Sequence, residues 1–219
     1  MNQIKNVIFD LGGVLLNIDY QKTIDAFRDL GIDDFQNMFS QANQNNLFDD
    51  LETGKISENE FLLNIKNYLP ENTSDSQIID AWNAMLLDFP EERLQLLNKV
   101  NKHYKVYLLS NTNIIHLKSY KNSLDQSFGY ITFSNCFKKV WLSHEVKMRK
   151  PHPETFIKLL ESENLSPSET FFIDDSVQHV EGAIKAGLKA YWLNLKEENN
   201  KTILDLFDEK GKINYSIIS

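Results

Sequence analysis

The sequence predicts an α/β protein in which a doubly wound parallel sheet carries a small inserted module of helices. One observation behind this prediction is that short apolar runs alternate with amphipathic helical patterns along the 219 residues, an order typical of a parallel sheet covered on both faces. The second is a stretch of about 70 residues after the first apolar run that shows helical patterns and no convincing strand. The length suits one domain with such an insertion.

Five apolar runs are predicted to be buried strands, because each is short and rich in Val, Ile, Leu or aromatic residues. They are Asn6–Asp10, Lys105–Ser110, Lys139–Leu142, Phe171–Asp174 and Ala190–Leu193. Helices are predicted over Glu91–Lys102, from Pro153 to about Glu163, over Val177–Ala186 and near Thr202–Glu209. Ser176 is the expected N-cap of the third helix, and Gly187 is placed to end it.

The inserted module is predicted to span residues 17–88, with residues 1–16 and 89–219 forming the α/β core. In open α/β sheets, ligands bind beyond the carboxyl ends of the strands. An insertion that leaves the end of the first strand is therefore expected to stand over the ligand site as a lid. Within the module, the Asn-rich stretch Gln41–Asn46 is expected to be a loop or a helix boundary.

Capping signals predict where the helices of the module begin. The capping residues are Asp19, Ser57 with Glu60, and Ser74 with Gln77. The two Ser pairs have the spacing of a capping box ahead of apolar helical runs. Gly31 is placed to end the first of these helices.

Composition excludes several classes of protein. The chain has 31 acidic and 23 basic residues, a net charge of -8, and no run rich in Lys or Arg, so we expect no nucleic-acid or anionic-membrane partner. It shows no convincing signal peptide and no apolar stretch of about 18 residues that could span a membrane. Cys136, the only cysteine, is expected to be a buried small hydrophobe. We expect a soluble cytoplasmic protein that is a monomer or a homodimer.

Polar residues stand where each predicted strand ends or leads into its loop. Asp10 ends the first strand, Ser110 the second and Asp174–Asp175 the fourth, while Lys150 follows the third. Adjacent acids repel each other unless a cation lies between them. Converging carboxylates therefore predict a hard dication with oxygen ligands, and Mg²⁺ is the natural choice. Mg²⁺ and a lysine beside hydroxyl and amide groups predict a phosphate site.

Four motifs together resemble the haloacid dehalogenase superfamily of phosphohydrolases. They are FDLGGVL at 9–15, LLSNTN at 108–113, MRKP at 148–151 and FFIDDS at 171–176. The resemblance covers nearly the whole chain, and the inserted helices resemble the small C1-type cap. Within the superfamily, the chain is most similar to the bacterial sugar-phosphate phosphatases that include α-D-glucose-1-phosphatase.

The resemblance implies a role for each residue of the acidic cluster. Asp10 would be the nucleophile that attacks phosphorus. Mg²⁺ would be held by Asp10, the backbone carbonyl of Gly12 and Asp175. Asp174 would support this site or ligate through water.

The resemblance also implies which groups bind the phosphoryl oxygens. Ser110 and the neighbouring Asn111 would bind them, and the backbone N–H groups of Leu11, Gly12 and Gly13 would add donors. Lys150 would neutralise the nucleophile and the charge that develops on the phosphoryl group.

The chain departs from the usual pattern at Gly12, where most phosphatases of the superfamily have an Asp that acts as general acid. Losing a general acid typically costs ~10²–10⁴-fold in rate. Three explanations stay open: a leaving group that departs easily, such as the anomeric oxygen of a sugar 1-phosphate; a substitute acid, with Asp19 or a cap residue as candidates; or a slow catalyst. His179 stands where relatives carry Asn or Asp, and either supports the metal site or only packs. Lys147 replaces a frequent Gly and is expected to face solvent.

Several other residues carry weaker expectations. Trp82 is expected in the core of the cap rather than at a sugar-stacking surface. Tyr20 and Asp19 could line the cleft, and Glu52–Lys55 could form the lip of the lid. Arg149 is expected to be structural or solvent-facing.

The sequence therefore predicts a Mg²⁺-dependent phosphomonoesterase for a small phosphorylated metabolite, acting through an aspartyl-phosphate. Glucose 1-phosphate is a candidate substrate. One alternative is a 2-haloacid dehalogenase-type hydrolase, which needs no metal; the pair Asp174–Asp175 argues against it. The other alternative is a slow or non-catalytic phosphate-binding protein, suggested by Gly12.

Overall fold

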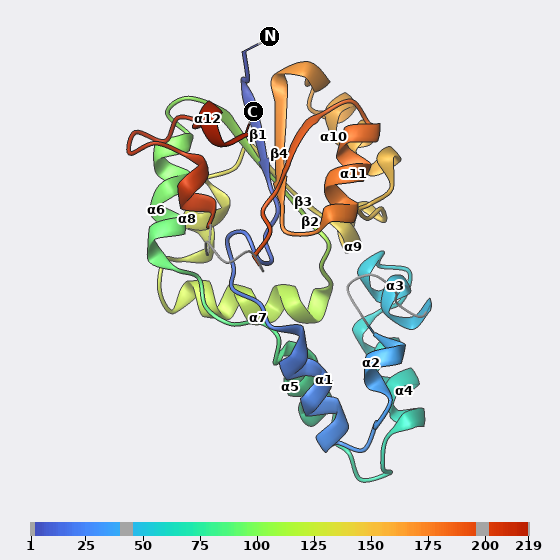
Figure 1. The fold of residues 1–219 in the computed structure, drawn as a ribbon. Helices are drawn as coiled ribbons and strands as arrows, with labels where there is room; N and C mark the ends of the chain where they lie inside the picture. Colours follow the sequence, from blue (N-terminus) through green and yellow to red (C-terminus); the bar gives the residue numbers. More distant parts are fainter. Residues whose placement is uncertain (1–2, 40–45, 196–201, 219) are drawn as a thin grey trace.

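A five-stranded parallel sheet forms the centre of the protein in the computed structural model, which describes residues 3–39, 46–195 and 202–218 (Figure 1). The strand order is β3-β2-β1-β4-β5. The strands are β1 (Asn6–Phe9), β2 (Lys105–Ser110), β3 (Lys139–Leu142), β4 (Thr170–Asp174) and β5 (Lys189–Trp192). All five predicted strands are confirmed, with ends that differ from the prediction by no more than one residue.

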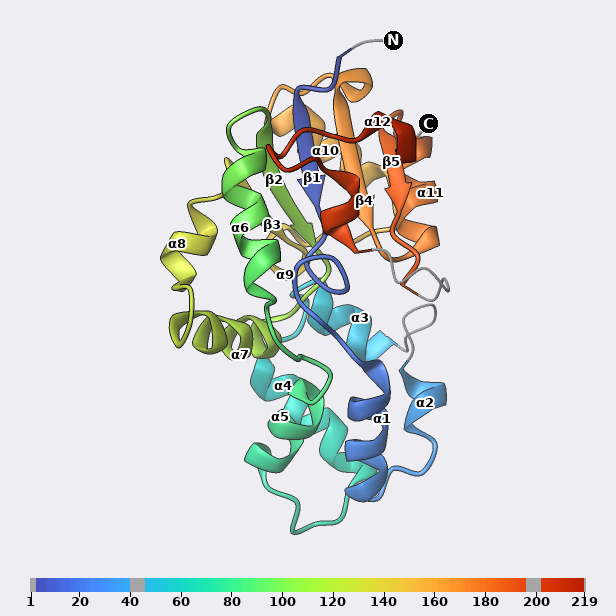
Figure 2. The same cartoon turned by 60° about the vertical axis from the view of Figure 1, so that its left-hand side comes forward.

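Helices cover both faces of the sheet, so the doubly wound prediction is also confirmed. They are α6 (Glu91–Val100), α7 (Ile114–Asp125), α8 (Tyr130–Ser134), α9 (Ser143–Val146), α10 (Pro153–Ser162), α11 (Val177–Lys185) and α12 (Tyr215–Ile218), with short 3₁₀ turns η2 (Pro167–Glu169) and η3 (Ile203–Leu206). In Figures 1 and 2, α6 and α8 lie on one side of the sheet and α10 and α11 on the other.

The alternation of side chains along β1 explains why it is apolar throughout. Val7 and Phe9 join the core under α6, which contains Leu97, whereas Ile8 joins the core under α10, which contains Phe156. Successive side chains of a strand point to opposite faces, and β1, with strands on both sides, is buried on both. A central strand must therefore be apolar at every position.

The inserted module consists of helices around its own aromatic core. They are α1 (Tyr20–Asp29), α2 (Phe35–Met38), α3 (Asn46–Glu52), α4 (Glu58–Ile65), the 3₁₀ turn η1 (Lys66–Tyr68) and α5 (Asp75–Asn83). Trp82 is fully buried there and packs against Phe39, Phe48 and Phe61, which confirms its predicted place in the core. Of the predicted loop Gln41–Asn46, residues 41–45 lie outside the described part of the chain.

The predicted caps of the module are confirmed. The Asp19 side chain accepts the amide N–H of Gln21 at the start of α1. Complete capping boxes, with side-chain and backbone bonds in both directions, begin α4 and α5. These local signals act through residues two or three positions apart, which is why the sequence predicts them well.

The module stands below the carboxyl ends of the strands in both ribbon views (Figures 1 and 2). Two chain crossings connect it to the core, and they are hydrogen-bonded to each other. The amide of Asn17 donates to the carbonyl of Asp88 at 2.9 Å, the amide of Leu87 donates to Asn17 at 3.0 Å, and that of Asp19 donates to Met85 at 2.9 Å. The module therefore leaves and re-enters the core at one point.

Three details differ from the prediction. Helix α6 ends at Val100, before the predicted end. Ser176 is the N-cap residue of α11, but its side chain makes no capping bond, and its amide donates to Asp174 Oδ1. The helix predicted near Thr202–Glu209 is only the 3₁₀ turn η3, whose capping box joins Thr202 to Asp205.

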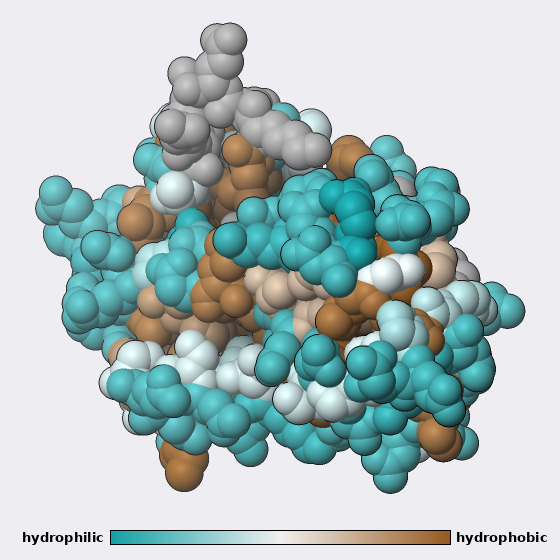
Figure 3. All heavy atoms as spheres, turned by 90° about the horizontal axis from the view of Figure 1, so that it is seen from below, coloured by the Kyte–Doolittle hydropathy of each residue, from teal (hydrophilic) through white to brown (hydrophobic). Residues whose placement is uncertain are grey.

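The surface agrees with the composition. Seen from the side of the module, most of the visible face is hydrophilic, with smaller hydrophobic areas between the polar side chains (Figure 3). Lys147 is exposed, as expected, and Cys136 is buried. Within the described residues, no helix combines the length and the apolar character needed to cross a membrane.

Candidate active site

Asp10 lies directly after β1 and its side chain is buried. Its amide donates to the carbonyl of Ile173 on β4 at 3.0 Å. The chain then turns back on itself, because the amides of Leu15 and Leu16 both donate to the carbonyl of Leu11 at 2.8 Å. This closed loop holds Asp10 at the carboxyl end of the sheet.

Lys150 is a fully buried cation between two carboxylates. Its ammonium group donates to Asp10 Oδ1 at 2.5 Å and to Asp174 Oδ2 at 2.6 Å. Burial acts to lower the pKa of Lys150, but the charges of Asp10 and Asp174 raise it above its ordinary value. The lysine is therefore charged at neutral pH.

The backbone of Lys150 is fixed by Asn111, which follows β2. The Asn111 Nδ2 donates to the Lys150 carbonyl at 2.9 Å, and the Lys150 amide donates to Asn111 Oδ1 at 3.0 Å. These two bonds use the Asn111 oxygen and one of its two side-chain N–H groups. The other N–H and the backbone amide stay available for the predicted contact with phosphate.

Asp174 is fully buried, and both of its oxygens have partners. Oδ2 accepts from Lys150, while Oδ1 accepts the amide of Ser176 at 2.8 Å and lies 2.9 Å from Nδ1 of His179. Although burial opposes ionisation, the charges of Lys150 and His179 lower the pKa of Asp174 to about 2. The geometry favours the supporting role expected for Asp174, and it gives His179 a contact at the site instead of packing alone.

Three carboxylates converge here. Asp10, Asp174 and Asp175 each offer an oxygen, and the three oxygens lie within 4.8 Å of one another. Burial raises the pKa of Asp10 to about 6, against the opposing charge of Lys150. Burial and the charges of Asp10 and Asp174 raise the pKa of Asp175 to about 8. One ammonium group does not balance three carboxylates, so these residues fit a hard cation with oxygen ligands, such as Mg²⁺.

We expect Mg²⁺ to stabilise the protein more at about pH 8 than at about pH 6. The pKa values of Asp10 and Asp175 are raised in the folded protein without metal. Between the ordinary Asp pKa of 3.8 and these raised values, the folded state therefore holds protons that the unfolded state has released. The stability contributed by these groups is therefore lost as pH rises toward 8. Mg²⁺ offsets this loss but must displace the protons at lower pH. Thermal melting with and without Mg²⁺ at the two pH values, at matched ionic strength, checks this. An equal shift at both would contradict it.

Gly13 allows Asp175 to approach the loop after β1. Its φ is +74°, and a Cβ atom there would lie 2.4 Å from Asp175 Oδ2. Its amide donates to the Leu16 carbonyl at 2.8 Å, which corrects the expectation that it binds phosphate. The donors of this loop that remain candidates are Leu11 and Gly12.

Replacing Gly13 with Ala is expected to weaken Mg²⁺ binding by roughly 10- to 100-fold, the usual cost of disturbing the support of a metal ligand. The new methyl group would displace the Asp175 carboxylate. Gly129→Ala is the matched control, because Gly129 has a φ of +87° and a Cβ there would meet nothing closer than Thr132 Oγ1 at 3.4 Å. Both variants carry a similar backbone strain of about 1–2 kcal/mol. Calorimetric Mg²⁺ titration of both checks this; equal affinities would contradict it.

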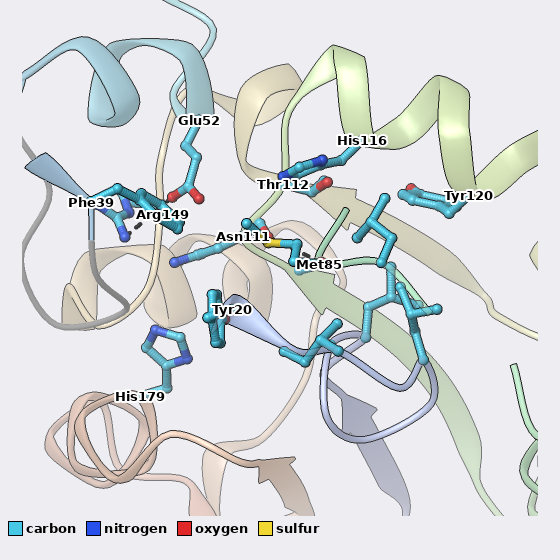
Figure 4. A pocket seen from close by; sticks show the side chains of 16 residues that line it. Tyr20, Phe39, Glu52, Met85, Asn111, Thr112, His116, Tyr120, Arg149 and His179 are labelled. Carbon is cyan, nitrogen blue, oxygen red and sulfur yellow. Dashed lines mark hydrogen bonds and ion pairs between the residues drawn. The ribbon is translucent and has the colours of Figure 1, made fainter. Parts of the chain in front are cut away.

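A small pocket of about 80 Å³ is lined by residues of the core and of the helical module (Figure 4). It adjoins the cluster, because Leu11, which follows Asp10, and His179, which contacts Asp174, both line it. Gly12, Ser110 and Asn111 line it from the core, and Tyr20 and Glu52 line it from the module. The pocket thus brings the expected phosphate-binding residues together with the proposed cleft residue Tyr20. His116 also lines it, and burial lowers the pKa of His116 to about 3, so this ring is neutral.

Arg149 connects the core to the module. Its guanidinium pairs with Asp49, and it pairs with Glu52 at 3.2 Å; both acids belong to α3. Next to them, a Cβ on Gly54 would lie 2.1 Å from the His144 carbonyl. The expected structural role of Arg149 is confirmed, and Glu52–Lys55 is docked on the core. The sequence did not reveal these partners; the acids of α3 were the only signal, and acids are common on helix surfaces.

Comparison with known proteins identifies relatives. A D-ribitol-5-phosphate phosphatase from Bacteroides thetaiotaomicron is 30% identical over 188 residues, which are 86% of this chain and 91% of the relative. A HAD family enzyme from the same species, solved as an Asp-to-Ala variant with magnesium and inorganic phosphate, is 38% identical and superposes with a TM-score of 0.82 over 89% of this chain and 96% of that one. A predicted HAD-like hydrolase from Porphyromonas gingivalis is 29% identical, with a TM-score of 0.80 over 90% and 94% of the two chains.

These relatives confirm the superfamily and the hydrolase class expected from the motifs. The narrower resemblance to glucose-1-phosphatases is not shown by them. The family model for haloacid dehalogenase-like hydrolases matches residues 4–187. This span contains strands β1 to β4, the inserted module and every residue of the carboxylate cluster. The chain therefore belongs to the haloacid dehalogenase-like hydrolase family.

Proposed function

We propose that this protein is a Mg²⁺-dependent phosphomonoesterase that hydrolyses a small phosphorylated metabolite. The observation that carries the proposal is the buried Asp10, paired with Lys150 and close to Asp175, at the start of the loop whose Leu11 and Gly12 line a pocket together with Ser110. The magnesium and phosphate of one relative, and the phosphatase activity named for another, support it.

The metal would be held by Asp10, Asp175 and the backbone carbonyl of Gly12, with Asp174 supporting them. When bound, Mg²⁺ supplies positive charge that screens the carboxylates from the phosphoryl group and stabilises the charge of the transition state. Lys150 has a third N–H beyond those given to Asp10 and Asp174, and this donor would bind a phosphoryl oxygen. The Ser110 hydroxyl and the amides of Leu11 and Gly12 would bind the others.

The reaction would take place in two displacements at phosphorus. An Asp10 carboxylate oxygen forms a bond to phosphorus while the bond from phosphorus to the substrate alcohol oxygen breaks, and the alcohol leaves with a proton from the pocket or from water. A water molecule then attacks the aspartyl-phosphate, and the bond to Asp10 breaks. The products are the alcohol and inorganic phosphate, and Asp10 returns to its carboxylate form.

A screen of phosphate release tests this proposal. Wild-type protein with Mg²⁺ should hydrolyse phosphorylated metabolites, and EDTA should stop the reaction. The panel should contain ribitol 5-phosphate, because of the relative, and glucose 1-phosphate with glucose 6-phosphate, because an anomeric oxygen leaves more easily than an ordinary alkoxide. Chloride release from a 2-haloacid in the presence of EDTA would instead show a dehalogenase. No turnover of any phosphate ester would overturn the proposal.

A slow catalyst remains the second candidate, because Gly12 replaces the general acid. The Asp19 side chain, one candidate substitute, is engaged in capping α1. A Cβ on Gly12 would lie 3.1 Å from Ile18 Cδ1, so an Asp side chain fits if the end of Ile18 shifts slightly.

Gly12→Asp is expected to raise the rate on alkyl phosphates by roughly 10²-fold or more if the missing acid limits the native enzyme. Combining Gly12→Asp with Ile18→Val relieves the crowding, so the double variant should raise the rate at least as much. Steady-state kinetics on an alkyl phosphate and on glucose 1-phosphate checks this, since the easier leaving group should gain less. An unchanged rate in both variants would show that the missing acid does not limit the native enzyme.

A further inference from the structure

A second, larger hollow lies beside the carboxylate cluster. It has a volume of about 610 Å³ and is lined by Asp19 and Tyr20 of the module and by Asp175 and Trp192 of the core. We call it the outer groove. Ile18 and Tyr20 line both the outer groove and the inner pocket, so the two adjoin. The outer groove has the size of a small-molecule site, whereas the inner pocket, at about 80 Å³, is well below that range.

Trp192 sets the outer groove apart from an ordinary surface hollow. Trp82 and Trp141 are buried, with 0% and 6% exposure, but Trp192 at the end of β5 is 42% exposed. Its Nε1 donates to the Asp175 carbonyl at 3.0 Å. The indole is therefore tied to a residue of the carboxylate cluster, with its polar edge satisfied and an apolar ring left at the groove.

The charge of the outer groove selects among possible occupants. Among the described residues that line it, Asp19 and Asp175 are acidic, Gln21 and Gln178 are neutral amides, and none is Lys, Arg or His. Carboxylates accept hydrogen bonds from hydroxyl groups, and amides both accept from them and donate to them. A second phosphate or a carboxylate on the substrate would meet the negative charge of Asp19 and no cation among these described lining residues, which is a repulsive element against such a substrate.

We infer that the outer groove holds the alcohol portion of the substrate, and that this portion is a neutral polyhydroxylated chain or sugar stacked on Trp192. The inference rests on the proposed phosphatase function. Phosphorus then lies at Asp10, the alcohol extends past Tyr20 into the groove, and Asp19 disfavours a second anionic group. Trp192 determines specificity and takes no part in the phosphoryl transfer.

Two variants of Trp192 test the stacking. Trp192→Ala should raise KM for ribitol 5-phosphate by about 3- to 10-fold, the worth of an aromatic contact, with kcat little changed. KM for acetyl phosphate, whose leaving group is too small to reach the ring, should stay the same. Trp192→Phe keeps an aromatic ring and removes the bond to Asp175, so it should retain most of the affinity for ribitol 5-phosphate.

A different pattern would overturn the inference. Trp192 acts through Asp175 and not on the alcohol if KM rises equally for both substrates. The same conclusion follows if Trp192→Phe raises KM for ribitol 5-phosphate as much as Trp192→Ala does. If neither substrate changes, the groove is not used. If the variants show either pattern but the wild-type protein hydrolyses acetyl phosphate, only the groove assignment is overturned. Wild-type protein that hydrolyses no phosphate ester overturns the proposed function and the groove assignment with it.

Asp19→Asn tests the exclusion of anions. Asn is as good an N-cap as Asp, so α1 should keep its start while the groove loses one charge. The ratio of kcat/KM for 6-phosphogluconate to that for ribitol 5-phosphate should rise by at least about 3-fold. Asp29→Asn is the matched control: it removes the same charge from the last residue of α1, and Asp29 does not line the groove. An unchanged ratio in Asp19→Asn, or an equal rise in the control, would overturn the role of Asp19.

Discussion

Asp10→Asn is expected to lower phosphate release by roughly 10⁴-fold or more, the scale of losing a catalytic nucleophile. An amide has no anionic oxygen to attack phosphorus. The shape of the side chain is kept, and its carbonyl oxygen can still accept the hydrogen bond that Lys150 gives to Asp10. The loss should therefore appear in kcat, measured by phosphate release with saturating substrate and Mg²⁺.

The stability of the same variant is an internal control. Asp10 is a buried carboxylate whose pKa is raised to about 6, so its charge costs the folded protein free energy when no metal is bound. Metal-free Asp10→Asn should melt no lower than the wild type. A variant that keeps its turnover would show that another group attacks phosphorus, and one that melts much lower would show that Asp10 is needed for folding.

Lys150→Met is expected to destabilise the protein by about 3–5 kcal/mol, because it removes the cation of a buried ion-pair network and leaves the carboxylates uncompensated. Lys150 is fully buried between Asp10 and Asp174. Met fills a similar volume, so the loss reflects charge and not a cavity. Phosphatase activity should be lost as well.

Chemical denaturation with and without Mg²⁺ measures this loss. Added Mg²⁺ should restore part of the stability, because the metal supplies charge at the same carboxylates. Lys147→Met is the matched control: Lys147 lies three residues away on the same loop and is exposed, so its replacement should change stability by no more than about 0.5 kcal/mol. Equal effects of the two substitutions would mean that the buried ion pairs contribute nothing.

The fold was largely predictable because its signals are local. A buried strand such as β1 must be apolar at each position, and a capping box such as that of Ser57 and Glu60 acts over three residues. The convergence of Asp10, Lys150 and Asp174 was predictable from topology as well, since the carboxyl ends of parallel strands meet at one edge of a sheet.

The contacts within the site were not predictable in the same way. The protein itself uses the amide of Gly13, and it uses the oxygen and one N–H of the Asn111 side chain. A Cβ on Gly13 would collide with Asp175, which lies 162 positions away (175 − 13) in the sequence. A sequence motif indicates which residue types lie together at a site, but it does not indicate which hydrogen bonds each of them makes within the folded protein. The partners of Arg149 on α3 depend likewise on how the module docks, which no local pattern encodes.

The pairing of the two crossings between core and module has a consequence for how such a protein can evolve. Asn17 and Asp88 are joined by a backbone hydrogen bond of 2.9 Å, so the chain ends created by cutting out the segment between them lie next to each other. A short turn could close that gap, and another helical insert could be joined to the same two ends. Exchange of the insert at this one junction would replace the residues that line the pocket from the module. The carboxylates and the lysine of the core would stay unchanged.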